Sequence, residues 1–130
     1  MKFSKAIIFI SILISIIHLL LSLYLDTRGE CILNEGIAFG ISVNHIYVIS
    51  IALILFLFGM AMTSKRTLRS FLFGIAILGI GNLLGRIYFS GICDYISLIN
   101  ISFNLIDIAI VSLCILSISH LIFNIPKTDS

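Results

Sequence analysis

Long runs of apolar residues, separated by short polar segments, dominate the pattern along this 130-residue chain. Four of these runs come close to the roughly 20 residues that a helix needs to cross the hydrocarbon core of a bilayer. Lipid offers no hydrogen-bond partners and the runs do not alternate as barrel strands do, so helices are expected. The pattern predicts an all-α integral membrane protein with a single four-helix transmembrane domain over residues 1–130. The expected spans are approximately Ala6–Leu25, His45–Met62, Phe71–Tyr88 and Ile101–Phe123.

Composition agrees with this class and narrows the range of partners. Apolar residues make up 60% of the chain and charged residues only 11%, which excludes an ordinary water-soluble domain. The formal net charge of +2 is explained by the membrane topology and implies no nucleic-acid partner. The first run is longer than the apolar core of a typical signal peptide and lacks a small-x-small cleavage pattern, so a retained helix is expected.

The basic residues predict the orientation of the four spans. Lysine and arginine are retained on the cytoplasmic side, and here they precede the first span, lie between the second and third and follow the fourth. The connection after the first span is acidic instead, with Asp26, Glu30 and Glu35. Both termini are therefore expected to be cytoplasmic, with the first and third connections outside. The basic residues concerned are Lys2, Lys5, Lys65, Arg66, Arg69 and Lys127.

Polar residues that are costly to bury gather at the predicted outer end of the bundle. Asn82 and Arg86 are four apart near the end of the third span, and Asn104 and Asp107 are three apart at the start of the fourth, so each pair shares a helix face. A carboxylate within an apolar helix costs at least ~2.5 kcal/mol near the bilayer centre and normally faces the bundle interior, which makes Asp107 a functional-site candidate. Each other residue also has a structural interpretation. Arg86 can snorkel to the headgroups, the asparagines can join helices, and Asp94 can lie in a solvated loop.

Two carboxylates at one membrane edge suggest a specific chemistry. If Asp94 and Asp107 approach each other, repulsion and desolvation keep one protonated while the other ionises. The ionised carboxylate can take a proton from water as the water attacks a peptide carbonyl, which the protonated carboxyl polarises. This arrangement needs no metal and no cofactor. The histidines, His18, His45 and His120, lie on different spans without metal-ligand spacing.

Four short segments resemble those of the lipoprotein signal peptidase (signal peptidase II) family. "NEGIAF" (34–39), "GNLLGR" (81–86), "CDYI" (93–96) and "FNLID" (103–107) follow one another like the family's N-x-G-x-A-F, G-N-x-x-D-R, V-D-F and F-N-x-A-D segments. The step of eight from Arg86 to Asp94 also matches. The resemblance covers the outer half of the chain and its four-span topology.

This resemblance implies an intramembrane aspartyl endopeptidase that removes the signal peptide from diacylglyceryl-modified prolipoproteins, cutting before the lipidated cysteine. Asp94 and Asp107 fall on the catalytic dyad of the family, which the cyclic peptide globomycin blocks. The resemblance also implies the cytoplasmic membrane of a bacterium, a site that faces outward, and lipid-modified prolipoprotein and membrane lipids as partners. A monomer is expected, although the sequence leaves the oligomeric state open. The residues that fall on the substrate-holding positions are Asn34, Gly36, Asn82, Arg86 and Asn104.

Three departures from the family pattern leave an alternative function open. Gly85 replaces the aspartate of G-N-x-x-D-R, Ile106 replaces a small residue, and the first span lacks the family's D-Q-x-x-K signature. The alternative is a non-catalytic paralogue that binds lipidated peptide or serves as a small membrane subunit. Gly81 and Gly85 also form a G-x-x-x-G ridge, expected to pack closely against another helix of the chain.

The cysteines suggest a covalent link at the outer end. Cys31 and Cys93 both lie in predicted outer segments, where an oxidising compartment permits a disulfide, whereas Cys114 is expected to be buried in the fourth span. Sequence alone does not supply the geometry that a disulfide needs. The pairing of Cys31 with Cys93 and two free thiols both remain open at this point.

Overall fold

The predicted number of spanning helices is confirmed. The computed structural model describes residues 2–36 and 45–123, and the side chains from residue 4 onward within these ranges. It contains four helices that are long and apolar enough to cross a membrane. The third helix begins at Arg66, five residues before the predicted Phe71, because only two residues connect it to the second helix. The helices are α1 (Lys2–Thr27), α2 (Ile46–Thr63), α3 (Arg66–Phe89) and α4 (Leu105–Phe123).

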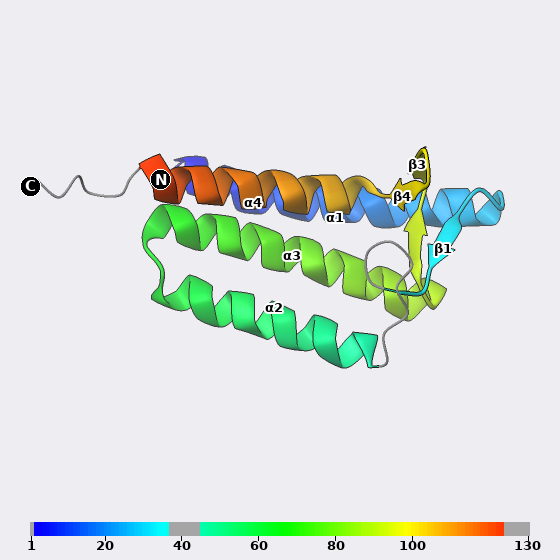
Figure 1. Cartoon of the computed structure of the whole chain (residues 1–130), viewed down its shortest axis with the longest axis horizontal. Coiled ribbons are helices and arrows are strands. Elements are labelled where there is room, and N and C mark those ends of the chain that lie inside the picture. Colours follow the sequence, from blue (N-terminus) through cyan, green and yellow to red (C-terminus); the bar gives the residue numbers. More distant parts are fainter. Residues whose placement is uncertain (1, 37–44, 124–130) are drawn as a thin grey trace, which may run out of the picture.

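Helix α3 is the centre of the bundle. Its apolar window is 56% buried, against 28% for α1 and 11% for each of α2 and α4. Helices α1, α2 and α4 pack around it, and Figure 1 shows the four helices running side by side. The apolar outer faces of α1, α2 and α4 are exposed in the protein, as expected for surfaces that meet lipid.

A stripe of small and polar residues allows α1 to approach α3 closely. The stripe residues recur every three or four positions and are all less than 9% exposed. Opposite them, a Cβ atom added at Gly74 would lie 2.9 Å from Ser11 Oγ, and one added at Gly81 would lie 2.8 Å from Ser15 Oγ. The absence of a side chain at these two glycines therefore sets the distance between the helices. The stripe consists of Ile7, Ser11, Ser15, His18 and Ser22.

The expected Gly81–Gly85 ridge is wrong for its second member. A Cβ atom at Gly85 would meet only Leu19 Cδ2, at an ordinary contact distance of 4.0 Å. The close approach instead involves Gly74 and Gly81, which are two helical turns apart on α3. Gly85 therefore has room for a small side chain.

Four strands of three residues each lie at one end of the bundle and were not predicted. Strand β1 (Ile32–Asn34) pairs antiparallel with β2 (Ile92–Asp94), so that Ile32 lies opposite Asp94. Strands β3 (Ile96–Leu98) and β4 (Ile101–Phe103) form a second antiparallel pair. Figure 1 shows both pairs at the end of the bundle opposite the N-terminus, which we call the strand end.

A disulfide joins the first connection to strand β2. The structure pairs Cys31 with Cys93, whose Cα atoms are 5.2 Å apart. Cys114 is free and only half-buried, rather than fully buried as expected. The disulfide covalently links the residue before β1 to strand β2, next to Asp94. It thereby holds the end of α1 close to the end of α3.

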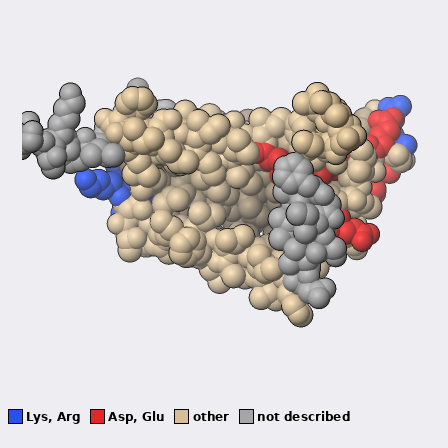
Figure 2. Space-filling model, in the orientation of Figure 1, with Lys and Arg blue, Asp and Glu red and all other residues tan. Residues whose placement is uncertain are grey.

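Charge is distributed unevenly along the bundle. Lys65, Arg66 and Arg69 lie at the α2–α3 connection, at the end opposite the strands. Figure 2 shows acidic atoms gathered at the strand end, with a few basic atoms beside them. Asp26, in the last turn of α1, lies at this end, and so do Glu30 and Glu35 in the connection that follows. Each end of the molecule therefore has its own charge character.

Candidate active site

Asp94, the last residue of strand β2, is almost completely buried. Its side chain is 2% exposed, and two asparagine amides donate to its carboxylate. Asn104 Nδ2 lies 2.9 Å from Oδ1, and Asn34 Nδ2 lies 3.2 Å from Oδ2. Each carboxylate oxygen therefore has a donor from a different segment of the chain, which partly offsets the loss of water.

Asp107 and Asn104 form a reciprocal cap at the start of α4. The side-chain Oδ1 of Asn104 accepts hydrogen bonds from the backbone N–H groups of Ile106 (2.9 Å) and Asp107 (3.2 Å). In return, the Asn104 backbone N–H donates to Asp107 Oδ2 at 3.0 Å. This is a capping box, in which a residue before the helix and the third helical residue satisfy each other's backbone donors.

The prediction that the fourth span begins at Ile101 is therefore wrong. Residues Ile101–Phe103 form strand β4, and the helix begins at Leu105, with Asn104 as its cap rather than a member of its first turns. Asn104 and Asp107 meet through backbone hydrogen bonds, not because they share a helix face. Hydropathy could not locate this boundary, because the strand residues are as apolar as the helix.

Asn104 brings the two aspartates together. Its side-chain amide contacts Asp94 and its backbone N–H contacts Asp107, so that both carboxylates are bound to one fully buried residue. The charges of Asp94 and Arg86 both act on the Asp107 carboxyl, and the Asn82 side chain lies close enough to influence it. Asp107 is half-buried, whereas Asp94 is enclosed. The predicted residues Asn82, Arg86, Asp94, Asn104 and Asp107 thus form one cluster, which we call the aspartate site.

Arg86 points into the protein and does not snorkel to the surface. It is 7% exposed, and its Nη2 donates to the backbone carbonyl of Gly36 at 2.7 Å. Asn34 holds the same turn, because its Oδ1 accepts from the Gly36 N–H at 3.0 Å. The predicted residues Asn34 and Gly36 therefore also join the site. The remainder of "NEGIAF", residues 37–39, lies outside the described residues.

Burial raises the pKa of the Asp94 carboxyl above its usual range. Hydrogen bonds from Asn104 and Asn34 and the charge of Arg86 act in the opposite direction, but they do not cancel the effect of burial. A carboxyl with a raised pKa can hold a proton closer to neutral pH than an exposed aspartate. Asp94 thus has the property that an acid–base residue needs.

His18 and Tyr95 belong to the site but were not identified from the sequence. The hydroxyl of Tyr95, the residue after Asp94, lies 3.2 Å from His18 Nδ1 and accepts a hydrogen bond from the Leu105 N–H at 3.1 Å. His18 is 1% exposed. The contact joins residues 77 positions apart, so no local spacing signals it.

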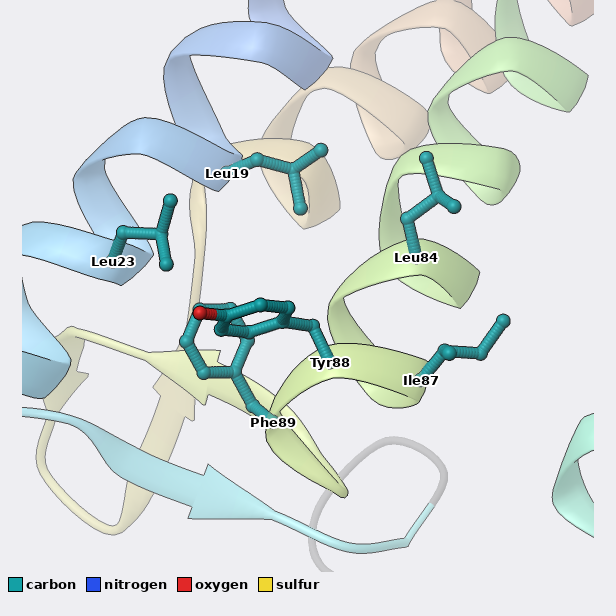
Figure 3. A pocket seen from close by; sticks show the side chains of 6 residues that line it. All are labelled: Leu19, Leu23, Leu84, Ile87, Tyr88 and Phe89. Atoms are coloured by element: carbon teal, nitrogen blue, oxygen red, sulfur yellow. The ribbon is translucent and has the colours of Figure 1, made fainter.

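An apolar pocket of about 460 Å³ lies between α1 and α3, apart from the aspartates. Figure 3 shows Leu19 and Leu23 of α1 facing the α3 side chains across it. None of its lining residues belongs to the aspartate site. Its lining is hydrocarbon except for one tyrosine, so it offers no acid–base chemistry. The residues from α3 are Leu84, Ile87, Tyr88 and Phe89.

Comparison of the chain with protein families, with curated proteins and with solved structures finds no match.

Proposed function

We propose that this protein is an aspartyl endopeptidase of the signal peptidase II type, which cleaves diacylglyceryl-modified prolipoproteins before the lipidated cysteine. The observation that carries the proposal is the convergence of Asp94 and Asp107 on Asn104 at one end of a membrane-spanning bundle. These are the two residues that fall on the family's dyad. The four motifs that resemble the family supply the substrate class.

The proposed reaction adds water across the scissile peptide bond. One aspartate, ionised, takes a proton from water while the water oxygen bonds to the carbonyl carbon, and the other aspartate donates a hydrogen bond to the carbonyl oxygen. Breakdown of the tetrahedral intermediate breaks the C–N bond and gives a proton to the leaving amine. Burial raises the pKa of Asp94, which supports the presence of one protonated carboxyl in the site.

The position of the site supports cleavage at a membrane edge. The aspartates lie where the spanning helices give way to strands, and Figure 2 shows the surface hollowed along α3, between α2 and α4, with acidic atoms beside the hollow. A substrate that is itself a membrane-inserted helix would present its final residues at this depth. The proposed orientation places the strand end outside and the basic end in the cytoplasm of a bacterium.

One observation favours a second function. The capping box gives Asp107 a role without any chemistry, because its side-chain oxygen accepts a hydrogen bond at the start of the helix. A non-catalytic paralogue that binds lipidated peptide would keep this residue for its fold. The absence of an aspartate at Gly85 also suits this second candidate.

The deciding experiment is cleavage of a diacylglyceryl-modified prolipoprotein peptide by the purified protein. We expect Asp94→Asn and Asp107→Asn each to abolish cleavage, and globomycin to inhibit the wild type. Asn at position 107 keeps an oxygen that can accept from the Asn104 N–H, so this variant separates the cap from the chemistry. Asp26→Asn is the matched control, because Asp26 is an exposed carboxylate at the same end.

One outcome would contradict the aspartyl mechanism, and another would contradict proteolysis itself. Normal cleavage by either site variant would exclude the dyad. Failure of the folded wild type to cleave a peptide that it binds would identify the binding paralogue.

A further inference from the structure

The Tyr95 hydroxyl connects three segments that the aspartate site depends on. It belongs to the residue after Asp94, it accepts from the first backbone N–H of α4, and it lies 3.2 Å from His18 Nδ1 on α1. The two rings also contact each other, with centroids 5.8 Å apart. We infer that His18 is a positioning residue: through the Tyr95 hydroxyl, it holds the strand that carries Asp94 against the helix start that carries Asp107.

Counting donors indicates how the contact is made. The Leu105 N–H donates to the phenol oxygen, so the phenol proton is available to His18. In the tautomer that carries the imidazole proton on Nε2, His18 Nδ1 accepts a hydrogen bond from this hydroxyl, and this is the tautomer that we infer. The hydroxyl is used as both donor and acceptor. Neither a phenylalanine at 95 nor an apolar residue at 18 can reproduce the link.

The link acts on both aspartates because its partners are their chain neighbours. Tyr95 follows Asp94 directly, and Leu105 follows Asn104, which contacts both carboxylates. Rotation of the tyrosine away from His18 would release the first N–H of α4 and shift Asn104 relative to Asp94. Catalysis is sensitive to such shifts, since a misplacement of about 1 Å can cost about 100-fold in rate.

Helix α1 provides a fixed support for this link. His18 lies on the buried stripe whose Ser11 and Ser15 pack against Gly74 and Gly81 of α3. The imidazole therefore has no route to the surface while the helices remain packed. Ser22, one turn further along the stripe, is equally buried, and its Oγ has no hydrogen-bond partner among the described residues. It provides a matched control for His18.

The first test uses NMR to report the environment of the two aspartate carboxyls and does not depend on activity. In wild-type protein, the side-chain carboxyl ¹³C resonances of Asp94 and Asp107 are assigned by their loss in Asp94→Asn and Asp107→Asn. We expect His18→Leu and Tyr95→Phe to shift both resonances in the same way. His18→Asn, whose amide oxygen can replace Nδ1 as acceptor, should restore them, and Ser22→Ala should leave them unchanged. Unshifted resonances in His18→Leu would overturn the inference.

Activity provides the second measurement, which rests on the proposed function. We expect His18→Leu and Tyr95→Phe each to lower kcat about 10- to 100-fold with little change in KM, and the double variant to be no worse than either. Additive decreases of kcat in the double variant, or a change in KM alone, would contradict a positioning role. If the wild type does not cleave, the protease proposal fails, while the carboxyl resonances still decide the role of His18.

Discussion

Asn104 is the residue on which the largest number of site contacts depends. Its side-chain oxygen caps α4, its amide nitrogen donates to Asp94, and its backbone N–H donates to Asp107. The amide oxygen therefore stabilises the start of α4, whereas the amide nitrogen binds Asp94 in the site. The residue is fully buried, so water cannot replace either contact.

The substitution Asn104→Asp separates these two roles. It keeps the capping oxygen but replaces the donor that faces Asp94 with a second carboxylate oxygen. We expect a loss of about 1–3 kcal/mol in the free energy of unfolding at neutral pH. The loss should shrink at acidic pH, because protonation of one carboxyl removes the repulsion and restores a donor. Thermal unfolding in detergent at both pH values measures the effect.

Asn100→Asp is the control for this variant. Asn100 lies in the exposed turn between β3 and β4, where a carboxylate stays solvated. Equal losses of stability in the two variants would show that the Asn104–Asp94 hydrogen bond contributes nothing.

The glycines of α3 provide a second prediction at this scale. We expect Gly81→Ala to destabilise the protein by about 1–3 kcal/mol, because its Cβ would lie 2.8 Å from Ile106 Cδ1, which is itself buried. Gly85→Ala should be neutral or stabilising by up to about 1 kcal/mol, because alanine favours the helix and the space is open. Thermal unfolding of the two variants side by side provides the measurement. A larger loss of stability for Gly85→Ala than for Gly81→Ala would show that Gly85 packs closely against another helix, contrary to the structure.

Among the elements, the three-residue strands hold the aspartate site together. Strand β1 brings Asn34 to Asp94, and β2 carries Asp94 itself. A pair of such short strands is weak alone, and the Cys31–Cys93 disulfide adds a covalent link beside it. The stability of the site therefore depends on this disulfide more than on the strand hydrogen bonds.

We predict that the oxidised protein has a mass about 2 Da below that of the reduced chain, because the disulfide removes two hydrogens. In the unfolded protein, a maleimide should modify one thiol, Cys114, before reduction and three after it. Mass spectrometry counts the modified thiols. Three modified thiols without reductant would exclude the disulfide.

The same disulfide should affect stability and turnover. Replacing Cys31 and Cys93 with serine is expected to cost about 2–4 kcal/mol in unfolding free energy and to slow cleavage, since Cys93 adjoins Asp94. Cys114→Ser is the matched control, because it removes a thiol and leaves the disulfide intact. A double variant as stable and active as this control would contradict the role of the link.

The elements also show what the sequence could and could not predict. Hydropathy located the four helices because burial in lipid requires long apolar runs. It missed the strands, because three residues are too few to show alternation, and it placed Ile101 in the fourth helix. The convergence of Asn34, Arg86 and the two aspartates was predictable from the motifs. The His18–Tyr95 contact and the spacing of Gly74 and Gly81 depend on how the helices pack, which no local pattern reveals.

At the scale of the whole molecule, the bundle has two chemically distinct ends. One carries Lys65, Arg66 and Arg69, and the other carries the strands, the disulfide and the aspartate site. This asymmetry matches the rule that lysine and arginine remain in the cytoplasm. In the proposed orientation, the disulfide would lie on the side of the membrane where oxidising conditions prevail.

Labelling of single cysteines in intact cells tests this orientation. We expect an impermeant maleimide to modify Asn100→Cys, in the exposed β3–β4 turn, and to modify Thr63→Cys, at the end of α2, only after the membrane is permeabilised. Both substitutions are made in the Cys114→Ser background, which removes the free thiol. The reverse pattern would invert the topology and turn the site towards the cytoplasm.

The capping box also bears on how such proteins diverge. Because α4 needs a hydrogen-bond acceptor at position 107 to begin where it does, selection for folding alone would preserve an aspartate or an asparagine there even without proteolysis. Asp94 has no such helix to support, and an uncharged residue that can accept from Asn34 and Asn104 would serve the fold equally well. Under the proposed function, replacement of Asp94 in descendants of this chain would therefore record the end of proteolysis, whereas position 107 would keep an oxygen acceptor as an inherited structural feature.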